Sequence, residues 1–104
     1  MALTREFRTT LQNRAQHDAA FRQGMLKEGI DTMLAGDMAT GKAILRDYIN
    51  AAVGFGSLSE ETRIPAKSLM RMLGPKGNPR ADNLFQIIHH LQMREGIQLG
   101  VGSC

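Results

Sequence analysis

The sequence predicts an all-α protein, and three observations support this fold class. Apolar residues recur at intervals of three and four along most of the chain, whereas alternation with a period of two is almost absent. Residues that start and stop helices separate these apolar stretches, most clearly at Asp18, at Gly36-Asp37 and at Gly54. The length of 104 residues, with 42% hydrophobic and 22% charged residues, fits one domain with a single packed core.

Residues 1–36 are expected to form two helices that extend the main domain. A helix over about residues 4–15 is predicted from apolar residues at every fourth position, Leu3, Phe7 and Leu11. Asp18 is the expected N-cap of the second helix, because its carboxylate can accept hydrogen bonds from free amides of the first turn. Gly24 and Gly29 interrupt this helix, which indicates close packing or local flexibility there. The residues expected to face inward from it are Phe21, Met25, Leu26, Ile30, Met33 and Leu34.

A third helix is expected to open the main domain, residues 37–104. Gly36 is a natural helix stop, and Asp37 directly after it is the expected N-cap. The buried stripe of this helix is predicted to contain Ile44, Leu45, Tyr48, Ile49 and Val53. Gly54 and Gly56 are expected to end it.

Two short helices and one longer helix are expected next. Ser57 and Glu60 have the spacing of a capping box, in which each side chain satisfies an amide of the new helix, so a helix is predicted over 57–63. Ile64-Pro65 ends it, and a second short helix is predicted over 66–73. The rest of the chain is expected to form a Gly- and Pro-rich loop over 74–79, a last helix over 81–94 and one short apolar strand over 97–102.

The two short helices have the spacing of a helix-turn-helix motif. Apolar or small residues occupy the positions that anchor the helices and fill the angle between them, namely Leu58, Ser59, Ile64, Leu69 and Met72. The remaining positions of the second helix are expected to face outward, and they are Ala66, Lys67, Ser68, Met70 and Arg71. In a helix-turn-helix protein this outward face enters the major groove of DNA.

Positive charge is concentrated at the same place. Residues 65–80 contain four basic side chains, Lys67, Arg71, Lys76 and Arg80, and no acidic one. Residues 1–64 contain eight basic and eight acidic residues, which cancel. The formal net charge of +3 only permits a nucleic-acid partner, but its concentration on one helix and the following loop favours one.

Catalytic, metal and nucleotide sites find little support in the sequence. Residues 36–42 match the phosphate-binding pattern G-x-x-x-x-G-K, but Ala43 stands where a hydroxyl must hold magnesium, and no strand precedes the segment. A nucleotide-binding protein or small enzyme is therefore the least favoured of the three hypotheses considered for this chain; the other two are DNA-binding proteins and are described below. His89 and His90 are adjacent on a helix and point about 100° apart, so they cannot share a metal ion. No catalytic residue, cofactor or metal is predicted.

The cellular location is expected to be the cytoplasm, without a membrane partner. No apolar stretch approaches the roughly 18 residues of a membrane span, and the start MALTREFR lacks the hydrophobic stretch of a secretory signal. The single cysteine, Cys104, cannot form an internal disulfide. The fold is therefore expected to depend on its core alone.

A longer pattern surrounds the helix-turn-helix motif between residues 58 and 91. It consists of Leu58, Thr62, Lys67-Ser68-Leu69, Leu73, Gly77-Asn78-Pro79 and Asn83-Leu84. This pattern resembles the helix-turn-helix antitoxins of bacterial toxin–antitoxin modules that are related to HigA, and the resemblance extends over roughly residues 37–101. Two positions depart from it: Arg63 lies where many helix-turn-helix proteins have a glycine at positive φ, and Pro65 replaces the usual Ser or Thr cap.

The resemblance implies a lambda-repressor-like DNA-binding domain that acts as a homodimer on a palindromic operator in double-stranded DNA. It also implies that the protein represses its own operon and neutralises a RelE/HigB-like toxin ribonuclease. Under this hypothesis Lys67, Ser68 and Arg71 read base edges or adjacent phosphates, while Ser57, Lys76, Asn78 and Arg80 contact the DNA backbone. The alternative is a stand-alone helix-turn-helix regulator without a toxin partner. Under both hypotheses residues 1–36 are expected to contribute to dimer or partner contact.

Overall fold

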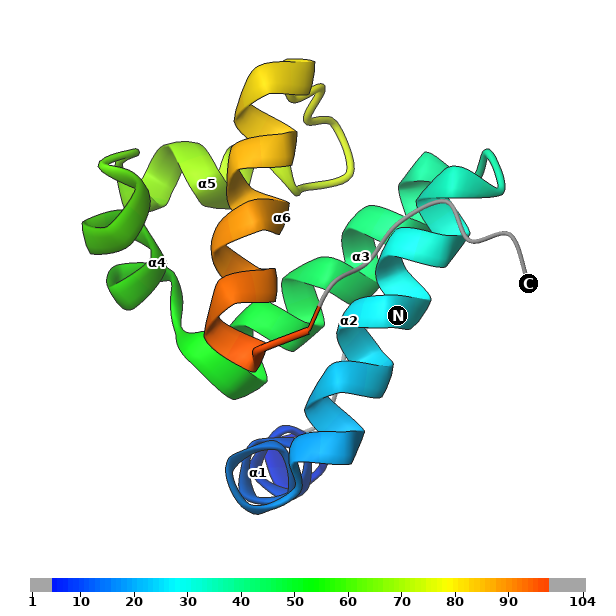
Figure 1. Ribbon diagram of the computed structural model, residues 1–104, viewed down its shortest axis with the longest axis vertical. Helices are drawn as coiled ribbons and strands as arrows, with labels where there is room; N and C mark the ends of the chain where they lie inside the picture. The colour runs from blue at the N-terminus through cyan, green and yellow to red at the C-terminus, as the bar shows by residue number, and fades with distance from the viewer. Residues whose placement is uncertain (1–4, 98–104) are drawn as a thin grey trace.

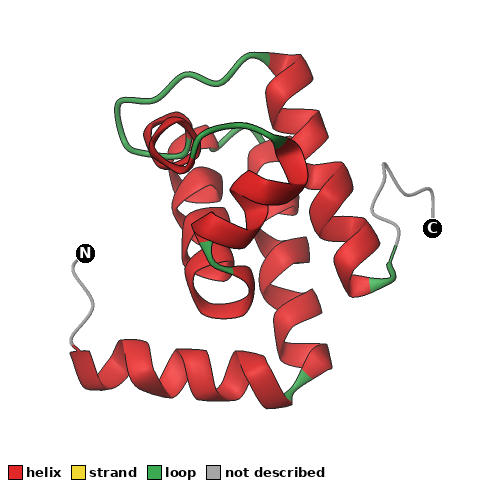
Figure 2. Cartoon of the chain, turned by 90° about the vertical axis from the view of Figure 1, so that its left-hand side faces the viewer, coloured by secondary structure: helices red, strands yellow, loops and turns green. Residues whose placement is uncertain are grey.

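The computed structural model describes residues 5–97, and all regular structure in this range is helical (Figure 2). The elements are α1 (Arg5–His17), α2 (Ala19–Leu34), α3 (Met38–Tyr48), the π-helix η1 (Ile49–Val53), α4 (Phe55–Thr62), α5 (Ala66–Met72) and α6 (Ala81–Glu95). The predicted all-α class is confirmed for these residues. The expected strand over 97–102 lies outside the described residues except for Ile97, which has no regular structure, and Cys104 lies outside them too.

The two predicted aspartate caps are present. The Asp18 carboxylate accepts a hydrogen bond from the Phe21 amide at 3.0 Å and so begins α2. The Asp37 carboxylate accepts one from the Thr40 amide at 3.1 Å and begins α3, and this hydrogen bond lowers the pKa of Asp37. The short turn between Leu34 and Met38 thus reverses the chain, and α2 and α3 run side by side (Figure 1).

The predicted capping box at Ser57 and Glu60 is wrong. Helix α4 begins two residues earlier than expected, at Phe55, so Ser57 lies inside its first turn, and no side-chain hydrogen bond caps the helix. The reason is that Phe55 is buried in the core and Gly54 provides the turn before it, with a φ of 88°. Burial of one aromatic ring therefore decides where α4 starts.

The buried stripe predicted to run to Val53 also takes a different local form. The regular α-helix stops at Tyr48 and continues as the π-helix η1, which the Gly54 amide closes by donating to the Ile49 carbonyl oxygen at 2.6 Å. Tyr48 and Ile49 are both fully buried at this transition. The chain stays helical up to Gly54, as predicted, but with a widened turn.

One core joins α2 to all the helices that follow it. Its buried members are Leu26, Ile30, Leu45, Tyr48, Ile49, Phe55, Leu58, Leu69, Leu73, Ile87, Ile88 and Leu91. The predicted boundary between residues 36 and 37 falls in the turn between α2 and α3, and the core extends across it. The expectation that Leu34 faces inward is wrong: it is the last residue of α2, and its side chain is 59% exposed.

Close packing between α2 and α3 depends on two glycines. A side chain at Gly41 would collide with the side chain of Met33, and one at Gly29 would lie 3.3 Å from the Ile44 Cγ2 atom and from the Leu45 amide nitrogen. The close packing expected at Gly29 is therefore confirmed. Gly24 is exposed, and a side chain there would meet no atom within 4 Å.

Candidate nucleic-acid interface

Helices α4 and α5 are joined by a tight turn of three residues, Arg63 to Pro65 (Figure 1). Arg63 adopts the left-handed backbone conformation, with φ 62° and ψ 22°, and its amide donates to the Ser59 carbonyl oxygen at 2.8 Å. The Ser59 hydroxyl donates to the Ile64 carbonyl oxygen at 2.6 Å. Arg63 departs from the glycine that many helix-turn-helix proteins have at this position, yet its backbone has the positive φ of that turn.

Interactions with α6 and the core fix the position of α4. Leu58 is fully buried, and Gln86 on α6 donates to the Thr62 carbonyl oxygen at 3.2 Å. Arg94 on the same helix pairs with Glu61 at 3.0 Å. These contacts hold the α4 end of the turn, so α5 leaves it in a defined direction.

The two sides of α5 differ in burial. Leu69 is fully buried, and Met72 and Ile64 are partly buried against the core, as the helix-turn-helix spacing predicted. Lys67, Met70 and Arg71 are exposed. The expectation that Ala66 and Ser68 face outward is wrong: both are half-buried, and Ala66 packs against the core because it begins the helix next to Ile64.

The loop after α5 is held against the rest of the molecule by two basic side chains of α3. The Lys42 ammonium donates to the carbonyl oxygens of Gly74 at 3.2 Å and Gly77 at 2.5 Å. Arg46 donates to the Leu73 carbonyl oxygen at 2.9 Å. Lys42 is only 7% exposed, so its charge is compensated by these carbonyl groups and not by water.

Gly77 brings this loop into direct contact with the end of α5. A side chain at this position would collide with the carbonyl groups of Arg71 and Met72. The residues on either side of Gly77, Lys76 and Asn78, are exposed. The loop therefore presents two of the predicted DNA contacts next to the helix that carries Lys67 and Arg71.

Sequence reasoning missed Lys42 as a residue that positions this interface. The useful signal was its register, because Lys42 lies three residues before the buried Leu45 and therefore on the core side of α3. A lysine at a core position must find acceptors, and here they are the loop carbonyl groups.

The predicted DNA contacts have different surroundings. Within the described part of the chain, the side chains of Lys67, Arg71 and Lys76 make no ion pair or hydrogen bond. Arg80 pairs with Asp82 at 3.5 Å, and both side chains are largely exposed. Ser57 is exposed on α4, outside the α5 and loop cluster, and Ser68 is half-buried. The structure thus brings most of the predicted cations to α5 and its loop.

A buried network ties α2, α3 and α6 together. The Glu95 carboxylate is 3% exposed, pairs with Arg22 at 3.1 Å and accepts a hydrogen bond from the Tyr48 hydroxyl at 2.6 Å. Arg22 also donates to the Ala15 carbonyl oxygen at 2.7 Å, which attaches α1. Burial and the hydrogen bond to Glu95 raise the pKa of Tyr48 well above its usual range.

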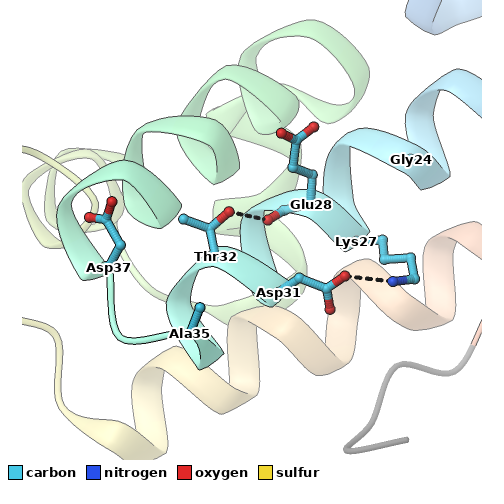
Figure 3. A pocket seen from close by; sticks show the side chains of 7 residues that line it. All are labelled: Gly24, Lys27, Glu28, Asp31, Thr32, Ala35 and Asp37. Carbon is cyan, nitrogen blue, oxygen red and sulfur yellow. Dashed lines mark hydrogen bonds and ion pairs between the residues drawn. The ribbon is translucent and has the colours of Figure 1, made fainter. Parts of the chain in front are cut away.

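The Gly36 to Lys42 segment has the wrong geometry for binding a nucleotide phosphate. It is a turn followed by α3, and Lys42 is already engaged with the loop carbonyl groups. The pocket next to it, shown in Figure 3, is lined by Gly24, Lys27, Glu28, Asp31, Thr32, Ala35 and Asp37. Its single cation, Lys27, pairs with Asp31, an interaction that raises the pKa of Lys27. The acidic groups of this pocket would repel a phosphate.

The described residues contain neither a metal site nor a membrane-spanning helix. Among residues 5–97, no group of three or more His, Cys, Asp or Glu side chains lies close enough together to hold a metal ion. Every helix in this range is too short or too polar to cross a membrane. No protein-family model matches the chain, and neither a curated protein nor a solved structure matches it significantly.

Proposed function

We propose that this protein is a sequence-specific DNA-binding repressor of the helix-turn-helix type, with a lambda-repressor-like arrangement of α3 to α6. The observation that carries this proposal is the exposed cluster of Lys67, Arg71 and Lys76, which have no partner among the described residues. Unpaired cations on one helix and the loop that touches it form a positive surface, and the phosphate backbone of DNA is the partner that such a surface fits best.

The α4–turn–α5 geometry supports the same proposal. A buried leucine in each helix, Leu58 and Leu69, anchors the pair to the core, while a left-handed residue at position 63 makes the turn. Lys67, Met70 and Arg71 on one side of α5 are exposed. An exposed helix face with anchored ends can enter a major groove without rearrangement of the core.

The proposed roles follow the burial of each side chain. Arg71 and Lys67 are the candidates for base edges, and Ser68, which is half-buried, is better placed for an adjacent phosphate. Lys76, Asn78 and Ser57 would contact the DNA backbone from the loop and from α4. Arg80 would do so after exchanging Asp82 for a phosphate, which the exposure of this ion pair makes inexpensive.

The active species is proposed to be a homodimer on a palindromic operator. With seven residues, α5 can read only a few base pairs, so a specific site requires a second recognition helix. Sedimentation of the protein with and without operator DNA tests this. A 1:1 complex with a half-site of full affinity would contradict it.

The biological context is proposed to be a toxin–antitoxin module in which the protein also neutralises a RelE/HigB-like toxin. Because α2 belongs to the core, a partner would contact α1 and the exposed side of α2, not a detachable segment. Co-expression with the product of the adjacent gene, followed by purification of a complex, tests this half of the proposal. If no such complex forms but operator binding is retained, the protein is a stand-alone regulator.

DNA binding itself is tested by electrophoretic shift with the DNA upstream of its own gene. The variant Lys67→Ala/Arg71→Ala should lose most of the affinity, by roughly 100-fold at moderate salt. The matched control, Arg14→Ala/Lys27→Ala, removes the same charge from α1 and α2 and should bind as the wild type does. Equally weak binding by the wild type and the α5 variant would overturn the proposal.

A further inference from the structure

The exposed side of α5 contains an apolar side chain among its cations. Met70 is 48% exposed, and it lies on the same side of the helix as Lys67, three residues earlier. On the other side of the helix, Leu69 and Met72 contact the core. Met70 makes no polar or ring contact in the described residues. Met70 therefore lies on the exposed side of α5, next to the cations proposed to bind DNA.

The chemistry of a methionine side chain restricts what it can contact there. A thioether carries no charge to neutralise a phosphate and no N–H or O–H group to donate to a base edge. Its sulfur is only a weak hydrogen-bond acceptor, so the side chain gains most of its free energy by covering apolar surface. On the base edges of the major groove, the apolar group is the C5-methyl of thymine.

We propose that Met70 contacts a thymine methyl group and so makes an A·T base pair part of the recognition sequence. This inference rests on the proposed DNA-binding function and adds to it the chemical identity of one base. Arg71 directly follows Met70, and arginine pairs best with guanine. From Lys67 to Arg71 the helix rises about 6 Å, or roughly two base steps, so the thymine lies within about two base pairs of that guanine.

The experiment begins with the full chain and a pool of randomised duplexes, from which the bound sequences are enriched. Each thymine of the enriched site is then replaced by deoxyuridine, which lacks the C5-methyl group but keeps the same hydrogen bonds. One thymine position in each half-site should be sensitive. A single replacement there should lower the affinity of the wild type about fourfold, which corresponds to about 0.8 kcal/mol for one buried methyl-sized group.

Variants assign this effect to Met70. Met70→Gln has a similar length but a polar end, so it should bind the thymine and deoxyuridine duplexes with equal affinity. Met70→Leu keeps an apolar side chain and should retain a preference for thymine. The matched control is Met93→Gln, because Met93 is 69% exposed on α6 and lies outside the proposed interface.

The outcomes separate the inference from the function on which it rests. The enriched site could tolerate deoxyuridine at every position and still show a guanine preference that disappears in Arg71→Ala. This result would overturn the role of Met70 and leave DNA recognition intact. An equal loss for Met70→Gln on both duplexes would also overturn it, since that pattern reports a general contact or a structural defect. If no duplex is enriched, the inference and the proposed function both fail.

Discussion

Two groups of cations have different neighbours: Arg14, Arg22 and Lys27 on α1 and α2, and Lys67, Arg71 and Lys76 on α5 and the loop after it. Arg14 pairs with Asp18 at 3.8 Å, Arg22 with the buried Glu95 at 3.1 Å, and Lys27 with Asp31. Lys67, Arg71 and Lys76 have no such partner in the described part of the chain. The first group stabilises the fold locally, whereas the second creates a positive potential that only an external anion can neutralise.

The largest effect is expected from reversing charge in the second group. Lys67→Glu/Lys76→Glu replaces two positive charges of the proposed DNA-binding surface with two negative ones and should lower operator affinity by about a thousandfold at moderate salt. Arg14→Glu/Lys27→Glu changes the net charge by the same amount on α1 and α2, and its affinity should stay within about threefold of wild type. Filter binding over a salt series measures both. A comparable loss in the two variants would show that only net charge matters and would remove the distinction between the regions.

A smaller loss is expected when the loop is released from α3. Lys42→Met keeps the aliphatic stem but removes the ammonium that holds the Gly74 and Gly77 carbonyl groups, so Lys76 and Asn78 lose their fixed position. Operator affinity should fall about tenfold, while the free energy of unfolding changes by only about 1–2 kcal/mol, because removing a buried charge offsets the lost hydrogen bonds.

The control for this loop variant is Lys27→Met, which removes an exposed lysine from the neighbouring helix. It should leave both affinity and stability near wild type. Urea unfolding and DNA titration of the same samples separate the two effects. A Lys42→Met protein with lowered stability but unchanged affinity would show that Lys42 serves the fold alone.

The network of Arg22, Glu95 and Tyr48 should make stability depend on alkaline pH through Tyr48, the only tyrosine in the chain. The unfolded state loses the tyrosine proton near pH 10, whereas the folded state keeps it to higher pH because burial and Glu95 raise the pKa. Above about pH 10 the folded state therefore binds more protons than the unfolded state, and the stability from this group falls by roughly 1.4 kcal/mol per pH unit.

Two measurements test this effect: ultraviolet titration of the single tyrosine, and urea unfolding between about pH 8 and pH 11. This range lies on either side of the ordinary tyrosine pKa. Tyr48→Phe should cost about 1–2 kcal/mol at neutral pH, since Glu95 loses one donor, but should lack this part of the alkaline decline. Ordinary ionisation of the tyrosine in the folded protein near pH 10 would contradict the buried network.

A contrast between local and long-range interactions explains how much of the molecule could be predicted from its sequence. Helix periodicity and the caps at Asp18 and Asp37 depend on local physics, so they were predicted correctly. The start of α4 was not, because burial of Phe55 overrides the local capping signal of Ser57. Lys42 and the Arg22–Glu95 pair were missed, because their partners lie far away along the chain and only the tertiary fold brings them together.

The smallest expected effect comes from Arg63, which has the backbone conformation of the usual glycine without being one. The turn requires a left-handed residue there, and a non-glycine residue is strained in that conformation by about 1–2 kcal/mol. Arg63→Gly removes the strain but increases the entropy of the unfolded chain, so the free energy of unfolding should rise by up to about 1 kcal/mol. Arg63→Asn, which also tolerates this conformation, should have a smaller effect in the same direction.

These two variants also test whether the turn belongs to the DNA-binding region or only supports it. Urea unfolding gives the change in stability, and operator titration gives the change in affinity. Because Arg63 is exposed, both variants remove the same positive charge from the surface next to α5. An equal small drop in affinity would therefore assign a phosphate contact to Arg63 itself. Unchanged affinity with increased stability in Arg63→Gly would mean that the arginine side chain contributes nothing to the interface, although its backbone conformation forms the turn.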